Sequence, residues 1–106
     1  MSQDITVVQP QGRLDTTSSP ALDVELRQHL AQGHTQILLD LSDTRYINSN
    51  GLRVLLRTSE EARRLGGRMK ICCLNARLTE IFAMAGFDQL FEIYETRAQA
   101  EKAFWE

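Results

Sequence analysis

The sequence lacks the long apolar run that a membrane-spanning helix requires. Its longest uninterrupted stretches of large aliphatic residues are Ile37–Leu39 and Val54–Leu56, far short of the roughly 20 residues that cross a bilayer. The first residues, Met1–Asp4, also lack the basic and then hydrophobic segments of a secretory signal peptide. These absences predict a cytoplasmic protein without a membrane partner.

Cysteine and net basic charge are also scarce. The two cysteines, Cys72 and Cys73, are adjacent, and neighbouring side chains on a strand point to opposite faces, so a disulfide between them would be strained. We therefore expect two buried thiols in a reducing compartment, without a metal or redox role. The formal net charge of −2 argues against nucleic acid as the main partner, because phosphate binding needs a clustered basic surface.

Sequence motifs for common enzyme chemistry are missing. Neither GxGxxG nor GxxxxGK[ST] occurs, so the two nucleotide-binding fingerprints are not met. Asp40 and Asp43 flank a predicted strand end, where open α/β sheets often bind ligands, but no third carboxylate or histidine follows closely. The sequence predicts no enzyme, no cofactor, no metal site and no catalytic residue.

The composition is that of one ordinary globular domain, which we place at residues 1–106. The hydrophobic fraction of 42% and the charged fraction of 25% argue against global disorder. A domain of this length buries roughly two thirds of the surface that its unfolded chain exposes. We therefore expect a single hydrophobic core to stabilise the fold without a disulfide or a bound metal.

Short apolar or β-branched runs alternate with segments whose apolar residues recur at helical spacing. Strands are predicted over residues 5–8, 36–41, 68–74 and 90–93, and residues 12–15 are interpreted as a turn or a strand exit. Because helical connections between strands favour parallel pairing, we expect an α/β fold with a mostly parallel four- to five-stranded sheet and about four helices.

The predicted helices have recognisable ends. The first has a hydroxyl cap at Ser18–Ser19 and Pro20 as its first helical residue, and it ends at Gly33 after an apolar stripe of Leu22, Leu26 and Leu30. The second ends at Gly66–Gly67, the third begins after Asn75 and closes at Gly86, and the fourth begins with a capping box over residues 96–99.

Residues 46–52, Tyr-Ile-Asn-Ser-Asn-Gly-Leu, fall where a strand gives way to the second helix. Asn48, Ser49 and Asn50 are all good N-cap residues, so one interpretation is a tight, capped turn and nothing more. The other is a switch at Ser49, because phosphorylation adds about −1.5 to −2 charges and a helix N-terminus tolerates an anion. A partner docked over the same turn would be repelled while the fold survived.

Three segments together resemble the STAS family, and specifically its anti-sigma factor antagonist branch. Residues 12–15, Gly-Arg-Leu-Asp, are similar to the family's Gly-Glu-Leu-Asp. Residues 37–52 resemble its strand followed by Asp-Ser-Ser/Thr-Gly-Leu, and residues 66–87 resemble its later strand and helix. The likeness covers residues 5–105, and the order and spacing of the segments make it specific.

The resemblance implies a regulatory binding domain that sequesters an anti-sigma factor, often a serine protein kinase, and so releases a sigma factor. The kinase phosphorylates the serine after the family's aspartate, here Ser49, and a cognate phosphatase reverses the modification. Two positions depart from the family pattern, since Asn48 replaces the aspartate and Asn50 replaces the second hydroxyl residue. Asparagine caps a helix as well as aspartate does, but a carboxylate beside the acceptor is lost.

Two alternatives stay open. The asparagines favour a STAS adaptor or scaffold subunit that is never phosphorylated. A small enzyme or ligand-binding protein would instead use the strand-end cleft near Asp40 and Ser49. The short segment before residues 5–8 also predicts a sheet edge that is bare or paired with another molecule.

The turn at residues 13–15, the junction itself and the exposed side of the second helix are the predicted docking surface. The candidate partner-binding residues are Arg13, Asp15, Asn48, Ser49, Asn50, Gly51, Arg53 and Arg57, with Ser49 as the candidate phosphorylation site.

Overall fold

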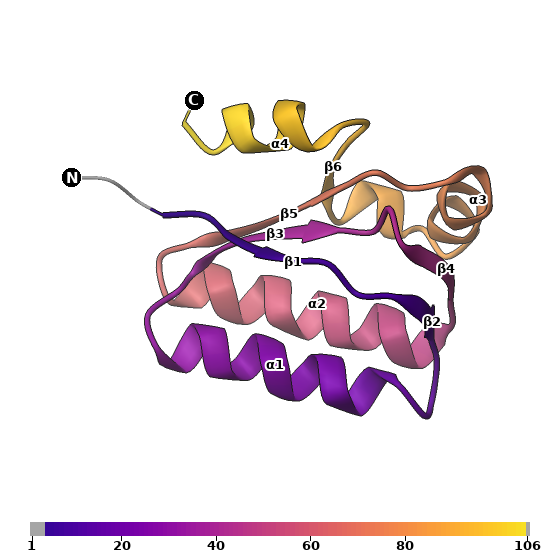
Figure 1. Cartoon of the computed structure of the whole chain (residues 1–106), viewed down its shortest axis with the longest axis horizontal. Helices are drawn as coiled ribbons and strands as arrows, with labels where there is room; N and C mark the ends of the chain where they lie inside the picture. The colour runs from indigo at the N-terminus through magenta and orange to yellow at the C-terminus, as the bar shows by residue number, and fades with distance from the viewer. Residues whose placement is uncertain (1–3, 106) are drawn as a thin grey trace.

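The computed structural model describes residues 4–105, in which strands and helices alternate along the chain (Figure 1). The strands are β1 (Thr6–Val8), β2 (Gly12–Leu14), β3 (Gln36–Asp40), β4 (Thr44–Ile47), β5 (Arg68–Cys72) and β6 (Glu92–Tyr94). The helices are α1 (Ser19–Ala31), α2 (Ser49–Arg64), α3 (Ala76–Met84) and α4 (Arg97–Ala103), with a 3-10 turn, η1, at Phe87–Gln89. The predicted α/β class with four helices is confirmed.

The strands form two parallel sheets. The larger has the order β1-β3-β5-β6, and β2 pairs with β4 separately. The prediction of a mostly parallel sheet is confirmed, but residues 12–15 were interpreted as a turn or strand exit, whereas residues 12–14 form β2. The last strand also begins later than predicted, at Glu92, because Leu90 still belongs to the turn that closes η1, its N–H donating to Phe87 O.

Side chains alternate between two differently covered faces of the larger sheet. On β3, Ile37 and Leu39 point into the main core beneath α1 and α2, whereas Leu38 packs with Cys72 and Ala100 beneath α4. Figure 1 shows α1 and α2 together on one face and α4 alone on the other. Each fully buried aliphatic side chain contributes about 1.5–3 kcal/mol, so the face with two long helices holds most of the apolar stabilisation.

The α4 face contains a buried lysine. Lys70 is 1% exposed, and its ammonium donates a hydrogen bond to Glu92 while lying 5.3 Å from the ring centroid of Phe104 on the α4 side. The hydrogen bond from Lys70 is the largest cause of a lowered pKa at Glu92. A charged pair flanked by an aromatic ring therefore helps to hold the C-terminal segment on this face.

The predicted helix ends are largely where the sequence placed them. Gly33 and Gly66 follow α1 and α2 with φ of 86° and 88°, the left-handed conformation that glycine adopts without steric cost. Asn75 caps α3 by accepting a hydrogen bond from Leu78 N at 2.8 Å, and Thr96 opens α4 with a complete capping box. The glycine and capping residues in the sequence were therefore sufficient to predict these helix ends.

Strand β1 forms one edge of the larger sheet, and within residues 4–105 it pairs with β3 alone. Residues 1–4 were expected to be too short for a further strand, and the first three of them lie outside the described residues. Over the described part of the chain, none of the helices combines the length and the apolar character needed to cross a bilayer.

Candidate partner-docking site at the start of helix α2

The junction between β4 and α2 is a capped helix start. Asn48 has an extended backbone, and its side-chain Oδ1 accepts hydrogen bonds from Asn50 N at 2.9 Å and from Gly51 N at 3.3 Å. Ser49 is the first residue of α2 and is exposed. Since Asn48 supplies the cap, the Ser49 hydroxyl stands at the helix N-terminus without serving as its capping group.

Hydrogen bonds and close packing fix the junction to the preceding part of the chain. Asn48 N donates to Leu14 O at 3.0 Å, and Asn50 Nδ2 donates to Thr16 Oγ1 at 2.8 Å. Gly51 is buried, and a Cβ atom there would lie 2.9 Å from Leu14 O and 2.6 Å from Ile47 Cγ1. Asn48, Asn50 and Gly51 therefore position the surface around Ser49 and are partly or wholly buried themselves.

The loop at Asp15 is organised by its own hydrogen bonds. The Asp15 carboxylate accepts from the backbone N–H groups of Thr17 and Ser18 at 3.1 and 3.2 Å, and the Ser18 N–H is the largest cause of a lowered pKa at Asp15. The expected hydroxyl cap of α1 is wrong, because the Ser18 hydroxyl donates to Arg13 O and accepts from Asp15 N instead, and Pro20 is the second helical residue because α1 begins at Ser19. Asp15 thus shapes the loop beside the junction.

Arg13 belongs to a stack that the sequence did not reveal. Its guanidinium lies 4.4 Å from the ring centroid of Tyr46, and the guanidinium of Arg77 at the start of α3 lies 5.2 Å from the same centroid. Parallel pairing of β2 with β4 sets Arg13 opposite Tyr46, three residues before Ser49. Two arginines held on one tyrosine make this side of the junction basic.

Arg53 and Arg57 extend from the junction along α2, and both are exposed. Arg53 lies one turn after Ser49, on the same side of the helix. Arg57 lies a further turn away and faces α1, where its Nη2 is 3.5 Å from Asp23 Oδ2. The structure therefore brings Arg53 close to the Ser49 surface, whereas Arg57 belongs to the groove between α1 and α2.

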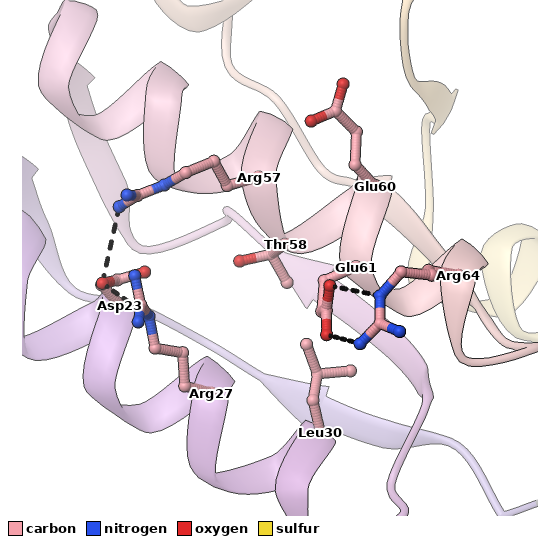
Figure 2. Close-up of a pocket in the computed structure, with 8 residues that line it drawn as sticks. All are labelled: Asp23, Arg27, Leu30, Arg57, Thr58, Glu60, Glu61 and Arg64. Carbon is pink, nitrogen blue, oxygen red and sulfur yellow. Dashed lines mark hydrogen bonds and ion pairs between the residues drawn. The ribbon is translucent and has the colours of Figure 1, made fainter.

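Figure 2 shows that groove, a cavity of about 490 Å³ lined by charged side chains of both helices. Asp23 contacts both Arg27 and Arg57, and Arg64 pairs with Glu61. Each arginine that lines the groove already has a carboxylate partner there, so the groove offers no uncompensated cation to a small anionic ligand.

Asp40 lies in different surroundings from Ser49. Its Oδ1 accepts from Ser42 N at 2.9 Å, and its Oδ2 is 3.8 Å from Arg97 of α4. Burial raises the pKa of Asp40, but hydrogen bonds from Ser42 and Cys73 and the charge of Arg97 outweigh it, so the net pKa is below the ordinary value. A shared cleft of Asp40 and Ser49, required by the enzyme or ligand-binding alternative, therefore gains no support.

Comparison with known proteins establishes the family. The sequence model of the STAS domain matches residues 1–100. The chain belongs to the STAS family. This STAS domain is 32% identical over 94 residues to a Bordetella bronchiseptica protein named as the anti-sigma factor antagonist BtrV, and the alignment covers 89% of this chain and 81% of the relative.

Solved structures share the fold. The crystal structure of a Thermotoga maritima protein named as an anti-sigma factor antagonist superposes with a TM-score of 0.92 at 20% identity, covering 100% of this chain and 92% of the other. The Bacillus cell fate determinant SpoIIAA in its phosphorylated form superposes with a TM-score of 0.71 at 17% identity, covering 96% and 92%. The predicted resemblance to the anti-sigma factor antagonist branch is confirmed.

Proposed function

We propose that this STAS domain is a cytoplasmic regulatory binding module that sequesters an anti-sigma factor with serine kinase activity and is released by phosphorylation of Ser49. The observation that carries the proposal is the exposed position of Ser49 as the first residue of α2, beside a cap supplied by Asn48. Its relation to a named anti-sigma factor antagonist supports the class of partner. A cognate phosphatase would restore binding.

The electrostatics of the junction are compatible with such a switch. The N-terminus of a helix carries about half a positive charge, and α2 spans 16 residues. A phosphate on Ser49 would be tolerated there, and the capping bonds of Asn48 would remain because they do not use the serine hydroxyl. SpoIIAA, whose fold is related to this one, has been solved in a phosphorylated form, which supports the proposal.

The chemistry of the surface favours an acidic partner. Arg13 and Arg77 flank Tyr46 beside the junction, and Arg53 is exposed one turn after Ser49. The Asp15 carboxylate accepts hydrogen bonds from its own loop and lies 3.7 Å from Arg13, so Arg53 and Arg77 are the arginines left for a partner. An acidic partner surface would be attracted to these arginines. Phosphorylation would place about two negative charges in the middle of that contact and so expel the partner.

The proposal is tested with the cognate kinase, Mg-ATP and mass spectrometry. We expect one phosphate on Ser49 and none on the Ser49→Ala protein, and we expect affinity for the kinase to fall on phosphorylation while the circular dichroism spectrum stays unchanged. The Ser49→Ala protein should bind its partner but fail to be released. If Ser49 stays unmodified and the Ser49→Ala protein binds and releases its partner normally, the switch is wrong.

A second candidate function is a constitutive STAS adaptor. It is favoured by Asn48 and Asn50, which leave no carboxylate on either side of the serine. Under this function the same docking surface is used, but mass spectrometry finds no phosphate, and a negative charge at Ser49 leaves partner affinity unchanged.

A further inference from the structure

The two cysteines lie together at the end of β5. Alternation along a strand predicts that neighbouring side chains point apart, so Cys72 and Cys73 were expected on opposite faces of the strand. In the structure the strand ends at Cys72, and Cys73 has φ of 72°. This turn of the backbone brings the two sulfur atoms to 3.0 Å from one another.

The backbone at Cys73 is unusual for its residue type. Within residues 4–105, Cys73 is the one non-glycine residue with positive φ, a conformation in which a Cβ atom is crowded by the following carbonyl. A residue held in a disfavoured conformation points to a function for its side chain. Here the side chain in question is a thiol directed at a second thiol.

The two thiols differ in accessibility. Cys72 is 0% exposed and packs beneath α4, whereas Cys73 is partly exposed. Burial is the largest cause of a raised pKa at Cys72, followed by its hydrogen bond with Cys73. Cys73 is therefore the sulfur that a reagent in solution meets first, and Cys72 is placed to react with it second.

A carboxylate completes the cluster but is already engaged. The side-chain ligand atoms of Asp40, Cys72 and Cys73 lie within 4.8 Å of one another. The Asp40 oxygens contact Ser42 N and Arg97, and Arg97 would compete with a bound cation. The arrangement favours chemistry between the sulfurs over capture of a metal ion.

We propose that Cys72 and Cys73 form a two-electron redox pair that closes to a disulfide when the protein meets a peroxide. The Cys73 sulfur attacks the peroxide, the O–O bond breaks, and Cys73 becomes a sulfenic acid with release of water. The Cys72 sulfur then attacks the Cys73 sulfur, the S–S bond forms, and the S–O bond breaks to release a second water. Two thiols lose two electrons and two protons, and one hydrogen peroxide is reduced to two waters.

The disulfide should be easily reduced. Adjacent Cα atoms are about 3.8 Å apart, whereas ordinary disulfides join Cα atoms separated by about 4.4–6.8 Å. The ring is therefore strained, and strained, accessible disulfides are the labile ones in a reducing compartment. The pair would act as a reversible site, in contrast to a structural disulfide.

The test uses the full chain, first reduced and then treated with a small excess of hydrogen peroxide. Intact-mass spectrometry should show a monomer that has lost two hydrogens, and both cysteines should resist alkylation until glutathione is added. In a chemical denaturant the ring should form at least about tenfold more slowly, because the fold no longer holds the sulfurs together.

Two variants keep the test decisive. Cys73→Gly suits the left-handed conformation and should fold at least as stably as the parent chain, and Cys72→Ser retains the exposed thiol. Neither should form the ring, and Cys72→Ser should give a sulfenic acid that dimedone traps. Two alkylatable thiols after peroxide treatment, oxidation only to sulfonic acid or to intermolecular dimers, or stoichiometric zinc that protects both thiols would each overturn the proposal.

Discussion

Two strand-to-helix junctions of this STAS domain have the same asparagine cap but expose different side chains. At β4–α2 the Asn48 side chain accepts hydrogen bonds from the first turn of the helix, and at β5–α3 the Asn75 side chain does the same. The first helical residue is an exposed serine, Ser49, in one case and an exposed alanine, Ala76, in the other. An asparagine cap alone therefore does not mark a functional site.

The junctions also differ in how they are anchored. The third helical residue of α3, Leu78, is fully buried in the core, whereas the third residue of α2, Gly51, has no side chain and lets the helix start approach β2 and β4 closely. The third residue of α3 anchors its helix start by a buried side chain, whereas the third residue of α2 allows close contact with Leu14 and Ile47 beside an exposed hydroxyl. The difference teaches that a small residue is required at the third position of α2, whereas α3 tolerates a large apolar one there.

The largest expected effect is on partner binding by Ser49→Asp. A carboxylate at the start of α2 should lower affinity for the anti-sigma factor at least about 100-fold, or about 2.7 kcal/mol, because it faces the docked partner. The matched control is Ala98→Asp, which adds the same charge to the first turn of α4 on the opposite sheet face. Calorimetric titration should find the control within about threefold of the parent, and equal losses in both variants would contradict a localised docking surface.

A smaller effect is expected from Gly51→Ala. The added Cβ atom would meet Ile47 and the carbonyl of Leu14, and overpacking of this kind costs about 1–3 kcal/mol. Chemical denaturation should show that loss, although alanine favours helices over glycine. The exposed neighbour Arg53→Ala should change stability by less than about 0.5 kcal/mol. Unchanged stability in Gly51→Ala would mean that the junction is looser than the structure shows.

The smallest effect should come from the caps themselves. Asn48→Ala and Asn75→Ala each remove a side-chain acceptor from a helix start, and each should cost about 1 kcal/mol in the free energy of unfolding. Thermal denaturation measures both. Partner affinity should fall in Asn48→Ala alone, because only that cap orients the surface around Ser49; a similar fall in Asn75→Ala would remove the distinction between the two junctions.

Much of the site was predictable because it depends on neighbours in the chain. Helix caps and stops are local, and the exposure of Ser49 follows from its place at the start of an amphipathic helix. Tyr46 and Arg77 were missed, since their stack with Arg13 joins three elements that only pairing of β2 with β4 and docking of α3 bring together. Asp15 was predicted as a partner contact, and in the structure its carboxylate accepts hydrogen bonds from its own loop and lies 3.7 Å from Arg13.

The sequence by itself determined the four helices, four of the strands, the buried stripes and the serine that follows the Asn48 cap, because periodicity, β-branching and capping act over a few residues; the two short strands β2 and β4 carried no such local signal. Only the tertiary structure decided that residues 12–14 form a strand, that Lys70 is buried beside Glu92, and that Cys73 turns its sulfur toward Cys72. Those outcomes depend on contacts between segments distant in the chain, and no local pattern encodes the energy of such contacts.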